Sequence, residues 1–141
     1  MKRMGLEMSR AQIDAMIEHA QEEFPNECCG LLAGVGTRVA HLFRGRNIDQ
    51  SPFTYRLDPH EQLQFFKDID AKGLELLGIY HSHTRSPAYP SRTDVAKAYY
   101  PDVAYVIVSL QTRETPLVRA FRIMKGREGD NAILDEELAV V

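Results

Sequence analysis

The sequence predicts an α/β domain in which a single mixed β-sheet is flanked by helices. The chain has 141 residues, which is the length of one domain and enough to bury a core without disulfides. Helical and strand-like hydrophobic patterns alternate along it. Several strand-like segments follow one another directly, as in hairpins, which favours a mixed sheet over a purely parallel one. We expect residues 1–141 to form one domain.

The first predicted helix begins at Ser9, a residue type that caps helix N-termini. Pro25 ends it, and the apolar residues between them recur at helical spacing: Ile13, Met16, Ile17, Ala20 and Phe24. Two strands are predicted next, from an apolar run at 28–35 and an alternating segment at 37–44, joined as a hairpin through a glycine-rich turn. Residues 53–57 are a further strand candidate.

A second helix is predicted to begin at Asp58 and Pro59, an N-cap residue followed by proline at the first helical position. It runs to Gly73, and three of its apolar side chains are predicted to face inward: Leu63, Phe66 and Ile69. The apolar run at 74–80 then predicts a strand that leads directly into two histidines.

The second half of the chain continues with a loop at 84–90 that contains two prolines. Residues 91–100 predict a short helix, and the apolar runs at 104–110 and 117–124 predict two paired strands. Residues 125–141 are acidic and weakly patterned, and no element is predicted for them.

The composition argues against several classes of function. Lys and Arg total 17 and Asp and Glu total 20, a net charge of −3, whereas nonspecific nucleic-acid binding needs a basic surface. No apolar run approaches the roughly 18 residues of a membrane span, and the first residues lack the apolar stretch of a signal peptide. Cys28 and Cys29 are adjacent, so a bridge between them would be strained. We therefore expect reduced, packed thiols in a cytoplasmic protein.

The segment that carries chemistry begins with His81 and His83 at the end of a predicted strand. Side chains two residues apart on a strand share one face, so both imidazoles can bind one metal ion. Asp94 lies beyond the loop, on the predicted first turn of a helix that can fold back onto the strand end. Two imidazoles and a carboxylate leave a fourth tetrahedral position open for water, which is the arrangement of a catalytic zinc site.

Such a site needs a general base within hydrogen-bond reach of the reacting water. Glu27 is the best candidate, because it precedes the first long strand at a point where its carboxylate can lean over a neighbouring strand end. Ser91 is the candidate oxyanion partner, because its hydroxyl can donate to a carbonyl oxygen that becomes negative.

Each of these residues also has an ordinary structural interpretation. A single His-x-His at a strand end is often structural, and Glu27 alone could be a solvated acid. Ser91 and Asp94 fit a capping box at a helix start. The remaining histidines lack metal-like spacing and are predicted to lie at the surface: His19, His41 and His60.

Taken together, the five residues resemble the signature of the JAMM (MPN-plus) metallopeptidase family. That signature is a glutamate near the first strand, then His-x-His, seven residues, serine, two residues and aspartate, and every position is filled here: Glu27, His81, His83, Ser91 and Asp94. The resemblance implies a curved, cytidine-deaminase-like mixed sheet sandwiched by helices. It also implies zinc held by the two histidines and the aspartate, with the glutamate and serine in catalysis.

Within this family the chain is most similar to small bacterial members of the Mec type, which remove cysteine from a ubiquitin-like sulfur-carrier protein. The resemblance therefore implies a carrier with a C-terminal Gly-Gly as partner, and it leaves room for a homodimer. One alternative is an isopeptidase that removes a ubiquitin-like modifier from lysine. Another is a non-catalytic MPN scaffold that only binds partners. A third, a metal-dependent hydrolase of small molecules, often needs a barrel longer than this chain.

Overall fold

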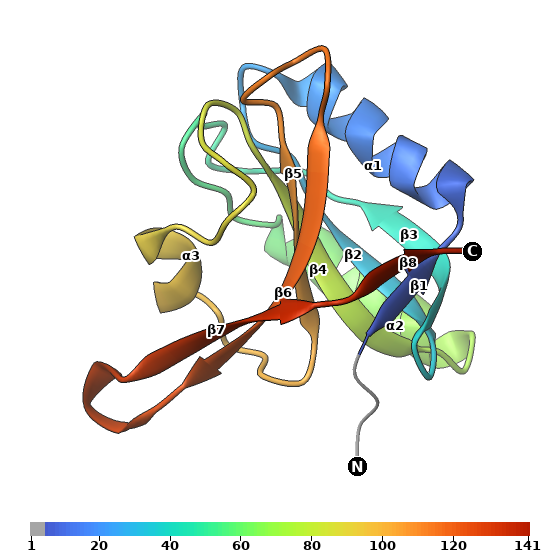
Figure 1. Ribbon diagram of the computed structural model, residues 1–141. Helices are drawn as coiled ribbons and strands as arrows, with labels where there is room; N and C mark the ends of the chain where they lie inside the picture. The colour runs from blue at the N-terminus through green and yellow to red at the C-terminus, as the bar shows by residue number, and fades with distance from the viewer. Residues whose placement is uncertain (1–4) are drawn as a thin grey trace.

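The computed structural model describes residues 5–141, drawn as a ribbon in Figure 1. The strands are β1 (Leu6–Met8), β2 (Cys29–Val35), β3 (Arg38–Arg44), β4 (Glu75–His83), β5 (Ala104–Ser109), β6 (Leu117–Lys125), β7 (Asn131–Glu136) and β8 (Leu138–Val140). The helices are α1 (Arg10–Glu23), α2 (Pro59–Ala71) and α3 (Arg92–Ala96), with a 3₁₀ turn η1 (Arg127–Gly129).

All the strands listed join one mixed sheet in the order β7-β6-β5-β4-β2-β3-β1-β8. The strands β7 and β8 are consecutive in sequence but lie at opposite ends of this order. The sheet therefore curls until it is nearly a barrel, and Leu6 N donates to Glu137 O at 2.8 Å where the two edges meet. Beside this junction Arg122 Nε donates to Glu136 Oε2 at 2.7 Å, and both side chains are buried. The predicted mixed sheet is confirmed.

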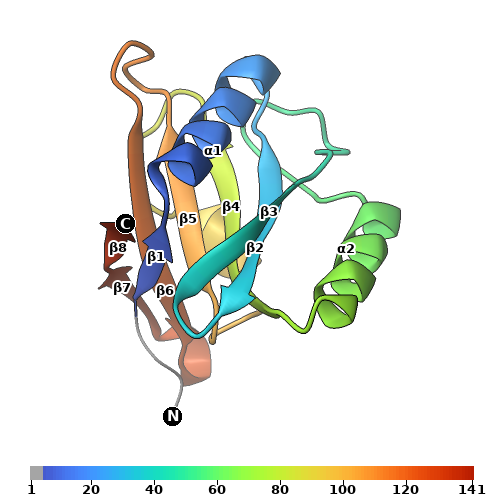
Figure 2. The ribbon, with the colours of Figure 1, turned by 90° about the vertical axis from the view of Figure 1, so that its right-hand side faces the viewer.

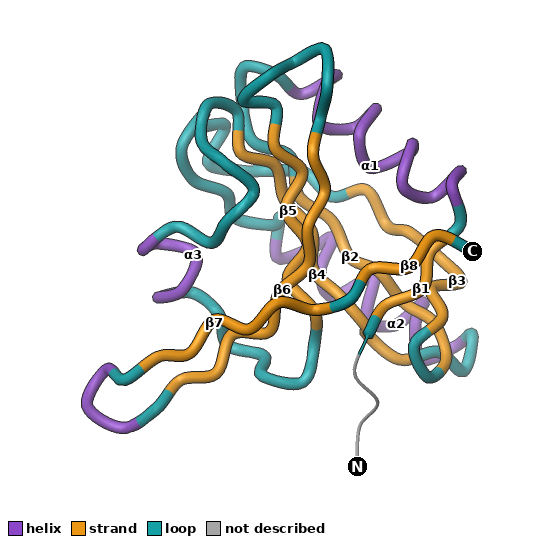
Figure 3. The backbone as a smooth tube through the Cα atoms, viewed as in Figure 1, coloured by secondary structure: helices purple, strands orange, loops and turns teal. Residues whose placement is uncertain are grey.

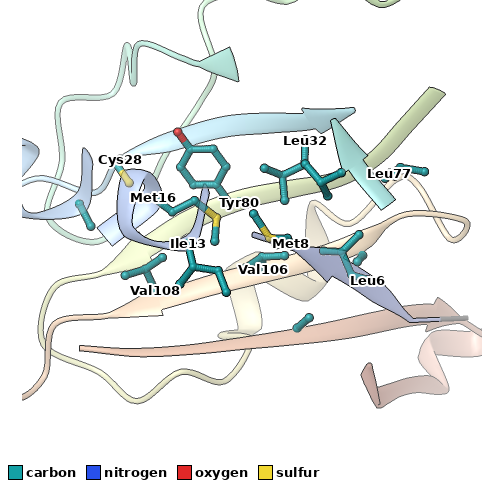
Figure 4. Packing of buried hydrophobic residues seen from close by; sticks show 14 of the residues in the cluster. Leu6, Met8, Ile13, Met16, Cys28, Leu32, Leu77, Tyr80, Val106 and Val108 are labelled. Atoms are coloured by element: carbon teal, nitrogen blue, oxygen red, sulfur yellow. The ribbon is translucent and has the colours of Figure 1, made fainter. Parts of the chain in front are cut away.

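The helices α1 and α2 cover opposite faces of the sheet, as Figure 2 shows. Ser9 and Gln12 form a capping box at the start of α1, and the apolar side of this helix packs over the strands. Figure 4 shows Ile13 and Met16 of α1 packed beside Met8 and Tyr80 in this core. The side chains of α2 pack on the other face of the sheet. They form a second core cluster there, which contains Leu31, Ala33, Phe43 and Ile69.

The site depends on two long loops, residues 45–57 and 84–90, which meet at one end of the sheet (Figure 3). Thr84 Oγ1 donates to Pro52 O at 3.0 Å and joins them. Cys29 is paired with His81 across β2 and β4, and the cysteines are both buried and free, as expected. Within residues 5–141 no helix is long and apolar enough to cross a membrane.

Several sequence expectations are wrong in detail. Residues 53–57 form no strand and contribute one isolated bridge, between Leu57 and Asn47. The predicted helix at 91–100 ends at Ala96, and beyond it Tyr100 N donates to the Tyr105 hydroxyl at 3.0 Å rather than to a helix carbonyl. Leu63 of α2 is 57% exposed.

The ends of the chain and one histidine also differ from expectation. The strands β1, β7 and β8 form where no strand was predicted. His19 is 2% exposed rather than a surface residue, because the side of α1 that carries it lies against β4. The other two histidines, His41 and His60, are exposed as predicted.

Candidate metal centre and active site

Three ligand atoms from β4 and α3 converge on one point. His81 Nε2 and His83 Nε2 lie 3.2 Å apart. Asp94 Oδ2 lies 3.2 Å from the first and 2.9 Å from the second. Ligands around tetrahedral zinc, at about 2.0–2.1 Å from the ion, are separated by about 3.3 Å. The donor set and its spacing therefore fit a zinc ion bound to His81, His83 and Asp94.

The local structure at α3 aims the carboxylate at the histidines. Ser91 Oγ accepts from Asp94 N at 3.0 Å, and Ser91 N donates to Asp94 Oδ2 at 2.8 Å. This is the capping box that the sequence offered as an alternative. It does not compete with the metal-site interpretation, because the same Oδ2 atom faces both imidazoles. The capping box instead holds the ligand oxygen in place.

The orientation of each imidazole suits a metal ligand. His83 Nδ1 lies 2.8 Å from Pro87 O, so the Nδ1 proton is donated to that carbonyl and Nε2 is left free to bind a metal. On His81, Nδ1 is buried without a hydrogen-bond partner among the described residues. The ring of Tyr55 stacks on the His81 ring, with centroids 4.5 Å apart and planes at 22°.

Burial and the contacts among the three side chains shift the pKa of each of them. Burial lowers the pKa of His81 below its ordinary value, because desolvation disfavours the charged ring. Burial raises the pKa of Asp94, but the hydrogen bonds from His81 and His83 outweigh it and hold that pKa well below its usual range. Burial lowers the pKa of His83, but the hydrogen bonds with Asp94 and Pro87 O outweigh it and raise that pKa above its ordinary value. Metal binding needs the ionised carboxylate and neutral imidazoles, so it would release a proton held at His83.

Glu27 has the environment of a proton-transfer group. Its side chain is only 4% exposed, and Oε1 is buried without a hydrogen-bond partner in the described chain. Burial raises the pKa of Glu27 to about 8. The alternative interpretation as a solvated acid is therefore wrong. A buried carboxylate oxygen without a partner is a costly feature that points to a reactant or ligand bound beside it.

A cavity of about 270 Å³ joins these groups at the junction of the two loops. Its lining residues are Glu27, Pro52, Phe53, His83, Thr84, Arg85, Ser86 and Ser91. The fold thus brings together the five residues that the sequence singled out, three of which, Glu27, His83 and Ser91, line this cavity. Asn47 and Tyr55 were not predicted from the sequence, since neither lies in a motif and the contacts that link them to the site, with Glu27 and His81, are with residues far along the chain.

The chain also matches a known protein family. Residues 9–124 match the family described as prokaryotic homologs of the JAB domain. The chain belongs to this family. It is 39% identical over 131 residues to the CysO-cysteine peptidase of Mycobacterium tuberculosis, which covers 92% of this chain and 86% of that protein. It is 37% identical over 124 residues to a probable TtuB-protein conjugate cleaving protease of Thermus thermophilus, covering 87% and 79%.

Solved structures of similar proteins agree with the fold of this JAB-family chain. A solution structure from Desulfitobacterium hafniense has a TM-score of 0.83 at 35% identity and covers 96% of this chain and 92% of that one. A JAB1/MPN domain protein from Archaeoglobus fulgidus has a TM-score of 0.61 at 20% identity, covering 97% and 98%. The expected JAMM/MPN fold is thereby confirmed. The relatives are named as a peptidase and a protease, and they class the chain as a peptidase.

Proposed function

We propose that this chain is a zinc-dependent peptidase that hydrolyses the amide bond after the C-terminal glycine of a ubiquitin-like sulfur-carrier protein. The product would be free cysteine, made as a step of cysteine synthesis. The observation that carries the proposal is the convergence of His81, His83 and Asp94 within 3.2 Å of one another, beside the buried and unpartnered carboxylate of Glu27.

In this proposal His81, His83 and Asp94 hold the metal. Zinc bound there supplies a Lewis acid and brings the pKa of a water molecule from 15.7 to about 7. Glu27 accepts a proton from the attacking water and then delivers it to the leaving amine. Burial beside the cavity raises the pKa of Glu27 above that of an ordinary carboxyl, which is the direction that a proton-transfer group working near neutral pH needs.

Ser91 is proposed to stabilise the negative oxygen that develops as water adds to the carbonyl. Its Oγ accepts the helix-capping hydrogen bond from Asp94 N, which leaves the hydroxyl proton available for donation into the cavity that Ser91 lines. Donors of this kind contribute roughly 100- to 1000-fold to the rate.

The substrate assignment is supported by a relative and by one side chain. The Mycobacterium tuberculosis protein is named a CysO-cysteine peptidase. Arg85 lines the same cavity as Glu27, and among the described residues no carboxylate forms an ion pair with it. A single amino acid that leaves from a C-terminus carries a free α-carboxylate, which a guanidinium recognises well. A lysine side chain in a protein conjugate carries no such group.

A second candidate function is the isopeptidase that removes a ubiquitin-like modifier from lysine. It is favoured by the relative from Thermus thermophilus, which is named for cleaving protein conjugates. A non-catalytic scaffold is disfavoured, because it would not need a full ligand set beside a buried acid.

We propose that the domain spans residues 1–141, since β7 and β8 extend the sheet beyond the residues that match the family. The free thiols of Cys28 and Cys29 support a cytoplasmic location. The homodimer, the absence of membrane contact and the absence of nucleic-acid binding stay predictions.

The deciding experiment compares two substrates with the zinc-loaded enzyme. One is a ubiquitin-like carrier with cysteine joined to its terminal glycine, and the other is the same carrier joined to a lysine side chain. We expect release of cysteine from the first and much slower cleavage of the second. Cleavage of the lysine conjugate alone would establish the isopeptidase instead.

The variant Glu27→Gln tests the proton-transfer role in the same assay. It keeps the shape of the side chain and removes the base, so turnover should fall about 100- to 10,000-fold while zinc content is retained. Glu23→Gln, at an exposed position nearby, is the matched control and should keep full activity. Near-normal turnover by Glu27→Gln would end the assignment.

A further inference from the structure

Glu27 lies before β2 and outside every strand and helix, so regular secondary structure does not hold it. Its main chain is bound instead by residues 45–57, which we call the 45–57 loop. Glu27 N donates to Ser51 O at 2.9 Å, and Glu27 O accepts from Asn47 Nδ2 at 3.0 Å. The position of the Glu27 carboxylate therefore depends on the conformation of this loop.

Asn47 organises the loop through four hydrogen bonds from one side chain. Its Nδ2 atom donates to Glu27 O and to Thr54 O, each at 3.0 Å. Its Oδ1 atom accepts from Asp49 N at 3.0 Å and from Arg56 N at 2.9 Å. Both acceptors are carbonyls and both donors are backbone amides, so the orientation of the Asn47 amide is unambiguous. Both side-chain protons and both lone pairs of the oxygen are used.

The same side chain reaches the metal centre through Tyr55. Tyr55 lies between Thr54 and Arg56, whose main chains Asn47 binds on either side. Its ring stacks on the ring of His81 at a centroid distance of 4.5 Å. One side chain therefore connects the acid that faces the cavity with the aromatic ring behind a metal ligand.

We propose that Asn47 is a positioning residue for the hydrolytic reaction. Through its hydrogen bond to the Glu27 carbonyl, Asn47 fixes the position of the Glu27 carboxylate. That position is fixed relative to the His81 imidazole, on which Tyr55 stacks. The inference rests on the proposed function, because it takes Glu27 as the proton-transfer group. Displacement of a reacting group by about 1 Å can slow a reaction about 100-fold, so the loss of Asn47 should slow turnover without removing any group that touches the substrate.

Asn47→Asp is the sharpest test because it preserves size and both acceptor contacts. It replaces the two donors with an oxygen that faces the carbonyls of Glu27 and Thr54, and these oxygens repel each other. We expect kcat to fall about 10- to 100-fold, with KM and zinc content near those of the wild type. Asn47→Ala, which removes all four hydrogen bonds, should show the same loss of kcat.

The matched control is Thr54→Val, which removes the hydrogen bond from Thr54 Oγ1 to Asp49 Oδ2 in the same loop. This change leaves the Thr54 carbonyl and all contacts of Asn47 in place, so kcat should stay near that of the wild type. Each kcat is measured per folded, zinc-loaded molecule, at a temperature well below the unfolding midpoint of every variant. A purely structural role for Asn47 would lower that midpoint and leave this kcat unchanged.

The outcomes separate the inference from the function on which it rests. If the wild type cleaves no ubiquitin-like substrate, or if Glu27→Gln is fully active, the proposed function fails and this inference fails with it. If Glu27→Gln is inactive while Asn47→Asp and Asn47→Ala keep kcat within twofold of the wild type, only this inference is overturned. If neither variant folds, hydrogen exchange of the Asn47 side-chain amide in the wild type decides. Exchange as fast as in a free amide would overturn the positioning role of Asn47.

Discussion

Nδ1 of His19 lies 2.7 Å from the hydroxyl oxygen of Tyr80. This contact joins α1 to β4 in the core, because Tyr80 is the residue of β4 that precedes His81. The two rings also meet edge to face, with centroids 5.8 Å apart. Burial, together with the positive charge of Arg44, lowers the pKa of His19 to about 4. The folded protein thus keeps this imidazole neutral across the physiological range.

The lowered pKa of His19 predicts how the stability of the protein depends on pH. An unfolded histidine binds a proton near pH 6.5, so between pH 6.5 and about 4 the unfolded state holds one more proton than the folded state. The free energy of unfolding should therefore decrease as pH falls through this window, by at most about 3 kcal/mol from this residue. Denaturant unfolding of the metal-free wild type and His19→Gln should show the smaller decrease in the variant. Equal dependence of stability on pH in the two proteins would contradict the prediction. The control is His41→Gln, at an exposed position of β3.

The metal ligands predict the zinc content directly. His81→Ala combined with Asp94→Ala removes two of the three converging side chains, so stoichiometric zinc should be lost. Elemental analysis after dialysis checks this, with His60→Ala, an exposed histidine at the start of α2, as the control. Zinc retained by the double variant would mean that the ligands are misassigned.

Ser91 predicts separate effects on stability and activity because one side chain has two contacts. Ser91→Ala removes both the cap and the hydroxyl donor, so it should cost about 1 kcal/mol of stability and roughly 100-fold or more in kcat. Ser91→Gly should keep most of the stability, because glycine caps helices almost as well as serine, but not the activity. Thermal unfolding and turnover of the two variants provide the comparison. Full activity in Ser91→Gly would leave Ser91 with the capping role alone.

The position of Arg85 in the cavity lining leads to a prediction about the leaving group. We expect the wild type to cleave the carrier–cysteine adduct about 10- to 100-fold faster than the same adduct with a C-terminal amide, because the amide removes the charge that Arg85 binds. Arg85→Ala should lose this preference, since its rate of cleaving the adduct with a free carboxylate would fall to its rate of cleaving the adduct with an amide. The measurement is kcat/KM for both enzymes with both substrates. If the wild type cleaves the two adducts equally, Arg85 has no role in recognising a carboxylate.

The helices and the long strands could be predicted because their signals are local. The capping residues, the period of the apolar side chains and the length of the buried runs lie within single segments. The residues of the metal centre could be predicted from the sequence for the same reason. His81 and His83 share a strand face by their spacing, and the capping box at Ser91 and Asp94 orients the third ligand within one helical turn.

Only the tertiary structure decided the features that depend on partners distant in the sequence. The strand β8 is three residues long and forms because it pairs with β1, and no pattern within those residues predicts such a partner. His19 is buried because α1 packs on Tyr80, and Glu27 is held by Asn47, twenty residues away. The sequence by itself determined which residues could bind a metal and catalyse hydrolysis, since residue type and local spacing are written in it. The protonation of those residues and the hydrogen bond from Asn47 that holds Glu27 depend on burial and long-range contacts, which exist only once the chain has folded.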